Sequence, residues 1–294
     1  MSAPMQSATA VTLPPPDQLA HGDFEMVVRR LADDLAFGTD HSRFVGSGIE
    51  YAQSRPYAPG DPIRSMDWRI TARLQRPFVK EYDAPKRTSV YLVVDTSASM
   101  AASSTPLSKH ALAVWIAAAL GLVAQRRMSP VAVVGAGERS TRLHPSLNRS
   151  ELWHALEPLR ASATRERTTL AAQLDRLSTR ARRASVVVAL SDLHDAGAIA
   201  ALRHTAQRHD CIAIHLADPA ERGRLRGGFF RGEEAESGRS FVAHGGASWG
   251  FEGATRADLA RAAVSYLRLQ TDLPFLAPLR HFLSFRPLLG GGHG

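Results

Sequence analysis

Cysteine and lysine are scarce in this sequence. One cysteine among 294 residues excludes an internal disulfide. It also excludes structural zinc sites and iron–sulfur clusters held by several thiolates. A lone cysteine is typical of a reducing compartment, so we expect a cytoplasmic protein. Lysine occurs only at Lys80, Lys86 and Lys109, so arginine supplies nearly all of the basic charge.

A long hydrophobic run is also missing. The most apolar stretch, residues 111–124, is shorter than the roughly 18–20 residues that span a bilayer, so we expect no membrane span. It predicts instead a helix that is buried on nearly all sides. Residues 1–22 have no basic residue before a hydrophobic run and contain three consecutive prolines. We therefore expect a disordered leader rather than a signal peptide.

Clusters of basic residues are absent too, although the net charge is +8 and the pI is about 10.3. Such a charge permits a polyanionic partner. The arginines are scattered, however, and form no basic stripe interleaved with aromatic residues. This pattern disfavours nucleic-acid binding, an alternative that a steep salt dependence of binding would identify.

The residue pattern of the chain is instead typical of an α/β protein. With 44% hydrophobic residues, the chain is also long enough to bury a core. An amphipathic helix is expected at 23–35, and an irregular segment at 38–86 ends in a strand at 78–82. Further strands are expected at 89–94, 131–134, 185–190 and 211–216, and helices at 105–127, 149–159, 170–182, 196–208 and 254–269. Thr105 is the expected cap of the first of these helices, with Pro106 at its first position. This alternation predicts a doubly wound, mainly parallel sheet with helices on both faces. The polar loop at 223–250 is expected to be mobile or to face a partner.

Oxygen-bearing side chains follow two of the predicted strands. Asp95, Ser97 and Ser99 come directly after one buried strand, and Asp192 follows another. Thr168 lies at the start of a predicted helix. Carboxylates and hydroxyls are hard ligands that suit Mg²⁺ or Mn²⁺ better than zinc or copper. Each piece alone is an ordinary capping turn, but their coincidence at strand ends favours a metal site.

The same residues allow an enzymatic alternative in which Asp95 is the nucleophile of a phosphotransferase or hydrolase. Acyl-phosphate chemistry on such a sheet often uses a second aspartate two residues on, where this chain has Ser97. The chain also lacks the phosphate-binding loop that many phosphotransferases use. No obvious general base stands beside the site, which favours adhesion over hydrolysis.

The segment 93–100, Val-Val-Asp-Thr-Ser-Ala-Ser-Met, resembles the metal-ion-dependent adhesion site (MIDAS) of von Willebrand factor A domains. The resemblance implies a von Willebrand A-like, Rossmann-type fold over residues 88–269. It also implies a metal held by Asp95, Ser97, Ser99, Thr168 and Asp192. That family usually has Gly-Gly-Thr before an apolar residue, whereas residues 166–170 are Glu-Arg-Thr-Thr-Leu, so Thr169 is an alternative to Thr168.

An upstream block runs from Arg55 through Tyr57, Gly60, Asp61, Arg64 and Asp67 to Trp68. With Gly-Ser-Gly-Ile-Glu at 46–50, this block resembles the domain of unknown function 58 family, in which it is joined to a von Willebrand A-like domain. The implied division is a leader at 1–22, a family-specific region at 23–87, the A-like domain at 88–269 and a tail at 270–294.

The resemblance implies a non-enzymatic interaction protein. Its partner would be a MoxR-type AAA+ ATPase, in chaperone-like remodelling or metalloenzyme maturation. A carboxylate from a protein ligand would complete the Mg²⁺ shell.

The upstream block by itself allows three interpretations. Its alternating Arg and Asp residues favour a lid that packs on the α/β domain and whose charged groups pair with one another. In that interpretation Trp68 is an anchor in a core. A surface for a partner protein and an anion site are the alternatives.

Overall fold

The computed structural model describes residues 21–36, 50–83, 88–138, 144–160, 166–195, 197–222, 229–233, 240–244 and 252–285. Residues 1–20 of the expected leader lie outside this part of the chain, and residues 21 and 22 begin the first helix.

A five-stranded parallel sheet organises the main domain. Its strands are β3 (Val90–Val94), β4 (Val131–Gly135), β5 (Val186–Ser191), β6 (Asp210–Ala217) and β9 (Ser265–Gln270). Their order in the sheet is β4-β3-β5-β6-β9, and every pair is parallel. The prediction of a parallel α/β sheet of the Rossmann-like class is thereby confirmed. The chain moves outward from β3 to β4 on one side and from β5 to β9 on the other, so the order reverses between β3 and β5.

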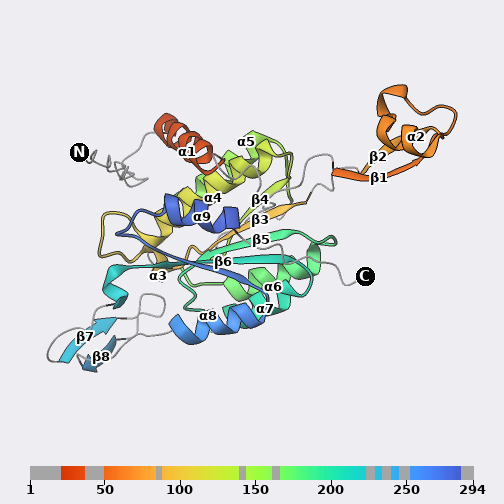
Figure 1. The fold of residues 1–294 in the computed structure, drawn as a ribbon. Coiled ribbons are helices and arrows are strands. Elements are labelled where there is room, and N and C mark those ends of the chain that lie inside the picture. The colour runs from red at the N-terminus through yellow and green to blue at the C-terminus, as the bar shows by residue number, and fades with distance from the viewer. Residues whose placement is uncertain are drawn as a thin grey trace, which may run out of the picture.

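Helices cover both faces of this sheet (Figure 1). One face carries α1 (His21–Ala36), α4 (Lys109–Arg126), α5 (Arg149–Arg160) and α9 (Leu276–Phe285). The other carries α6 (Leu170–Arg180), α7 (Ala198–Ala206) and α8 (Glu252–Arg261). Successive strand residues point to opposite faces, so Leu92 joins the first core and Val93 the second. The central strands β3 and β5 are near-continuous apolar runs, as expected for strands that are buried on both faces.

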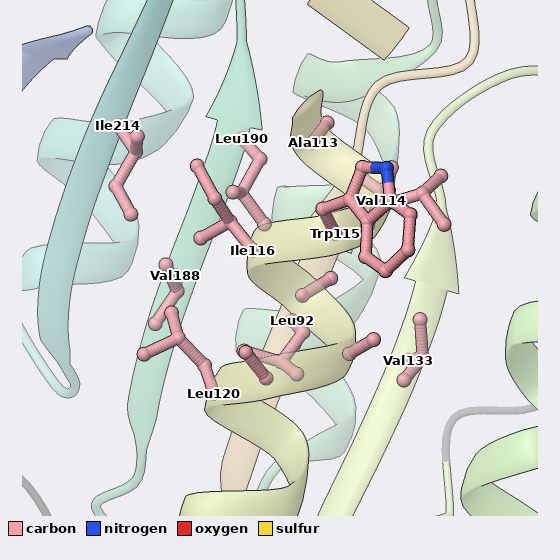
Figure 2. Close-up of a cluster of buried hydrophobic side chains, with 14 of the residues drawn as sticks. Leu92, Ala113, Val114, Trp115, Ile116, Leu120, Val133, Val188, Leu190 and Ile214 are labelled. Carbon is pink, nitrogen blue, oxygen red and sulfur yellow. The ribbon is translucent and has the colours of Figure 1, made fainter. Parts of the chain in front are cut away.

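Helix α4 lies at the centre of the first core, as its apolar composition predicts. Every residue from 109 to 125 is buried. Ile116 and Leu120 lie beside Val188 of the sheet (Figure 2). On the other side Trp115 meets Phe24 of α1 with ring centroids 4.8 Å apart, which ties the first helix to the core.

The start of α4 differs from the prediction. The helix begins at Lys109, and Ser108 caps it by accepting a hydrogen bond from the Ala111 amide at 3.0 Å. The expected cap, Thr105, instead donates its hydroxyl to the Leu107 carbonyl and contacts the Thr271 hydroxyl. Tertiary contacts of the preceding loop therefore displace the helix start by several residues.

The predicted helix at 254–269 is also wrong, because the structure divides it in two. Helix α8 ends at Arg261, and Ala263 adopts a left-handed φ of 59° that stops it. The chain then enters β9, which adds a fifth parallel strand beside β6. Within the loop at 223–250, two short strands, β7 (Phe229–Glu233) and β8 (Ser240–His244), pair antiparallel. The rest of that loop lies outside the described residues.

A small hairpin unit, residues 50–83, precedes the sheet domain. It contains β1 (Glu50–Pro56), the 3-10 turn η2 (Ile63–Ser65), α2 (Trp68–Leu74) and β2 (Phe78–Asp83). Strands β1 and β2 pair antiparallel, and both η2 and α2 pack on β2 (Figure 1). The expected Arg–carboxylate fork is present, because Arg55 donates two hydrogen bonds to Asp61, at 2.7 and 2.8 Å.

The expected core anchor in this unit is wrong. Trp68 is 64% exposed, and no residue of α2 is buried. The principal contacts of the unit are internal, between its own strands and turns, rather than those of a lid packed on the sheet domain. A short helix on a two-stranded hairpin encloses too little volume to bury an indole ring.

Candidate functional site

The predicted site residues meet at the carboxyl ends of β3 and β5. These two strands are neighbours, and the strand order reverses between them. Asp95 directly follows β3, and its backbone amide donates to the Leu190 carbonyl of β5 at 2.9 Å. Asp192 directly follows β5. Ligands of open parallel sheets bind in the crevice beyond such a switch point, so the topology places both carboxylates at the expected binding edge.

The loop after β3 folds tightly around Asp95. One carboxylate oxygen, Oδ1, accepts the Ser97 amide at 3.0 Å, which turns the chain into the short helix α3 (Ala98–Ala101). The Ser97 and Ser99 hydroxyls are 3.1 Å apart. This i, i+2, i+4 pattern therefore directs two hydroxyls and one carboxylate toward the same point.

The structure distinguishes the two threonines before α6. The Thr168 hydroxyl lies 3.4 Å from Asp95 Oδ2. The Thr169 hydroxyl instead donates to the Gly137 carbonyl at 2.8 Å, away from the carboxylates. Thr168 is thus the threonine that the fold brings to the site, and Thr169 holds the loop after β4.

Asp192 is paired with a buried lysine that the sequence analysis did not anticipate. Lys109 Nζ lies 2.9 Å from Asp192 Oδ2 and also contacts Glu221 of η3 (Pro219–Arg222). The half-exposed His194 lies 3.3 Å from the same Asp192 oxygen. The Lys109 side chain is only 3% exposed, so two carboxylates must stabilise its charge.

The two aspartates have opposite pKa shifts. Burial, followed by the negative charge of Asp192, raises the pKa of Asp95 to about 7, against the lowering effect of hydrogen bonds from Ser191 and Ser97. Burial opposes ionisation of Asp192 as well. There, the charges of Lys109 and His194 and the hydrogen bonds from Lys109 and Ser99 outweigh burial and lower the pKa. Asp192 therefore has a counter-ion, whereas Asp95 has none among the side chains that the structure describes.

Four contributors escaped the sequence analysis: Lys109, Ser191, His194 and Glu221. Ser191 donates to Asp95 Oδ2 at 2.6 Å. One sequence signal could have found Lys109, because it is a rare lysine at the head of an otherwise apolar buried helix. Glu221 offers no comparable signal, since it lies in a polar loop with several other glutamates nearby.

The donor chemistry fits a hard divalent cation on the Asp95 side of the site. Asp95 Oδ2 and the hydroxyls of Ser97, Ser99 and Thr168 are oxygen donors, as Mg²⁺ and Mn²⁺ prefer. Ligand atoms of Asp192, His194 and Glu221 also lie within 4.8 Å of one another. The Lys109 ammonium already contacts both carboxylates of that group, which makes it the less suitable position.

Three comparisons with known proteins bear on identity. Uncharacterized proteins of Mycobacterium bovis and Mycobacterium tuberculosis are each 32% identical over 287 residues, covering 89% of this chain and 87% of theirs. No solved structure matches. Among the described residues, no helix is long and apolar enough to cross a membrane. The family described as "Protein of unknown function DUF58" matches residues 53–248, and the chain belongs to this family.

Proposed function

We propose that this protein is a non-enzymatic, Mg²⁺-dependent interaction adaptor that works with a MoxR-type AAA+ ATPase in the cytoplasm. The expected setting is chaperone-like remodelling or metalloenzyme maturation. In this proposal the α/β domain is von Willebrand A-like, and its carboxyl-end loops form the binding surface.

One observation carries the proposal: five oxygen-bearing residues from three separate loops converge on one sheet edge. They are Asp95, Ser97, Ser99, Thr168 and Asp192. A purely structural turn needs only the local bond from the Ser97 amide to Asp95. Asp192 and Thr168 accept only long local bonds, from the His194 and Leu170 amides at 3.4 Å each. These local turns do not require that a second buried carboxylate and three hydroxyls meet at one place, and this convergence supports a cation site.

The charge distribution supports a cation specifically at Asp95. Lys109 neutralises Asp192, while Asp95 is left buried beside that second carboxylate without a positive partner among the described side chains. A bound Mg²⁺ would supply that charge and an open coordination position for a carboxylate of the partner. The hydroxyls of Ser97, Ser99 and Thr168 are neutral donors, so the site keeps the electrophilicity that an incoming carboxylate requires.

Direct binding to a MoxR-type AAA+ ATPase from the same genome tests the proposal. We expect the wild-type protein to bind the purified ATPase in Mg²⁺ and to lose at least tenfold in affinity in EDTA. Asp95→Ala should cause the same loss while the protein stays folded. Thr169→Ala is the matched control, because it changes a neighbouring residue that points away from the site.

Binding that is equal in Mg²⁺ and EDTA, and equal for Asp95→Ala, would move the interface away from this edge. Absence of binding by wild-type protein would reject the ATPase as partner. Phosphoryl transfer to Asp95 from a small phosphoryl donor would establish the enzymatic alternative instead.

A further inference from the structure

Two carboxylates share the buried Lys109 ammonium behind the candidate cation site. Lys109 Nζ donates to Asp192 Oδ2 at 2.9 Å and also to Glu221 Oε1. One oxygen of Asp192 and one of Glu221 lie within 4.8 Å of each other. Burial by itself would lower the pKa of Lys109, but the charge of Asp192 and the hydrogen bond to Glu221 raise it. Lys109 is therefore a positive charge that either carboxylate can hold.

The turn after β6 fixes Glu221 in this position. Asp218 directly follows β6, and its carboxylate accepts the Ala220 amide at 2.9 Å while its carbonyl accepts the Glu221 amide at 3.0 Å. The same carboxylate accepts the Ser104 amide at 2.8 Å, from the loop between α3 and α4. The segment that carries Glu221 is thus attached to the loop that leads into Lys109. The contact between these two charged groups is therefore supported by the backbone on both sides.

The charges around the site match a divalent cation only when Glu221 is counted. Three carboxylates, those of Asp95, Asp192 and Glu221, share one buried ammonium, that of Lys109. When all three carboxylates are ionised, the negative charges exceed this buried positive charge by two, which is the charge of Mg²⁺. Glu221 contacts the ammonium, so it contributes to this balance without being one of the expected ligands.

We propose that Glu221 is a positioning residue for this cation site and acts through Lys109. A divalent cation that approaches Asp192 repels the Lys109 ammonium, and Glu221 then holds that ammonium. Asp192 becomes free to ligate the cation directly or through water. Without Glu221, the ammonium has no second carboxylate among the described residues, so it stays on Asp192 and competes with the cation. The inference rests on the proposed function, because it concerns the same cation.

Calorimetric titration of the full chain with Mg²⁺ tests this role. Glu221→Gln should weaken Mg²⁺ binding about tenfold. The variant should stay folded, because the Lys109 ammonium still faces the Asp192 carboxylate. Glu221→Asp keeps the charge and should retain most of the affinity. Glu138→Gln is the matched control, since it removes the same charge from an exposed glutamate just beyond β4, at the same edge of the sheet. This control should bind Mg²⁺ as the wild type does.

A double-mutant cycle separates an action through Lys109 from the loss of a nearby negative charge. In Lys109→Met the ammonium is gone, so adding Glu221→Gln should change Mg²⁺ affinity by less than about threefold. Hydrogen exchange supplies a second measurement that needs no variant of Lys109. Mg²⁺ should slow the exchange of amides in residues 219–222 of the wild type, because the ammonium then pairs with Glu221 alone. The same slowing should be lost in Glu221→Gln.

The outcomes distinguish this inference from the proposed function. If Glu221→Gln binds Mg²⁺ as tightly as Glu138→Gln and the wild type, the inference is overturned and the cation site stands. An equal loss of affinity in the wild-type and Lys109→Met backgrounds, or exchange at 219–222 that does not respond to Mg²⁺, would also overturn the action through Lys109. A wild type that binds no Mg²⁺ would reject the cation site itself, and with it both the proposed function and this inference.

Discussion

Asp67 in the hairpin unit and Asp95 in the sheet domain have similar partners but opposite electrostatics. Each accepts a hydrogen bond from a serine hydroxyl and another from a backbone amide. Hydrogen bonds from Ser54 and from the Ile70 amide lower the pKa of Asp67. Burial and the charge of Asp192 raise the pKa of Asp95 to about 7.

The neighbourhood explains this difference. Asp67 is shielded from direct contact with water but lies in a thin unit, where solvent is close on every side and no second carboxylate contributes to its pKa. Asp95 lies deep at the edge of a sheet covered on both faces, beside another buried carboxylate. An aspartate that only caps a turn or a helix, as Asp67 does, has a structural role. The second carboxylate, brought by an adjacent strand, makes the arrangement around Asp95 a candidate cation site.

Removing Lys109 should have the largest effect. Lys109→Met leaves Asp192 buried without its counter-ion, which should cost about 3–5 kcal/mol of unfolding free energy. Divalent cations should restore much of that loss in Lys109→Met and stabilise the wild type less. Urea unfolding in EDTA and in Mg²⁺ or Mn²⁺ measures both. Lys80→Met, on the exposed surface of the hairpin unit, is the control. A loss below about 1 kcal/mol would show that the buried pair is not what neutralises Asp192.

Neutralising Asp95 should have the next largest effect, and its sign depends on pH. Unfolded aspartate ionises near pH 4, whereas folded Asp95 keeps its proton until about pH 7. The folded state therefore binds more protons in this interval, and without metal the wild type should lose stability as pH rises from about 4 to 7. Asp95→Asn removes the ionisation and should be more stable than wild type by up to about 4 kcal/mol at pH 8 in EDTA, which corresponds to the shift in the pKa of Asp95 from about 4 to about 7.

Urea titrations at several pH values measure this dependence, and Mg²⁺ should stabilise the wild type but not Asp95→Asn. The quantity to follow is the difference in unfolding free energy between the wild type and Asp95→Asn. If this difference stays constant between pH 4 and pH 7, or changes in favour of the wild type, the raised pKa of Asp95 is contradicted.

Changing either of the adjacent threonines, Thr168 or Thr169, should have a smaller effect, on Mg²⁺ affinity for the first and on stability for the second. Thr168→Ala removes one of the proposed metal donors and should weaken Mg²⁺ binding about tenfold, with little change in stability in EDTA. Thr169→Ala should leave Mg²⁺ affinity unchanged but cost about 1 kcal/mol, because the Gly137 carbonyl loses its hydrogen bond. Calorimetric titration and urea unfolding of both variants separate these roles. The reverse assignment would follow if Thr169→Ala were the variant with weakened Mg²⁺ binding.

Changing Asp67 should have the smallest global effect. Asp67→Asn weakens the cap of α2 and the tie to Ser54, so amides in residues 54–80 should exchange with solvent faster. The main unfolding transition should stay unchanged, because the principal contacts of the hairpin unit are internal. Hydrogen exchange with mass spectrometry measures the local effect. Coupled loss of protection in β3 and β5 would show instead that the unit and the sheet domain open together.

Local patterns predicted much of the fold because they report burial and periodicity directly. The continuous apolar runs at Val90–Val94 and Val186–Ser191 indicated strands covered on both faces, and the structure has them there. The start of α4 and the division of residues 254–269 escaped prediction. The start of α4 depends on competition for hydrogen bonds, because the Thr105 hydroxyl bonds to the Leu107 carbonyl instead of capping the helix. The end of α8 depends on the left-handed backbone of Ala263. Neither effect produces a periodic pattern in the sequence.

For the candidate site, the residue pattern alone predicted that Asp95, Ser97, Ser99 and Asp192 follow buried strands. Because the carboxyl ends of parallel strands share one edge of the sheet, it also predicted that these residues lie close together. The identity of the threonine that reaches Asp95, and of the cation that neutralises Asp192, became visible in the folded protein alone. Lys109 and Asp192 are 83 residues apart, and their contact requires the order of the strands and the axial position of α4 together. Electrostatic pairing in a core is a property of that long-range arrangement, so no local pattern in the chain encodes it.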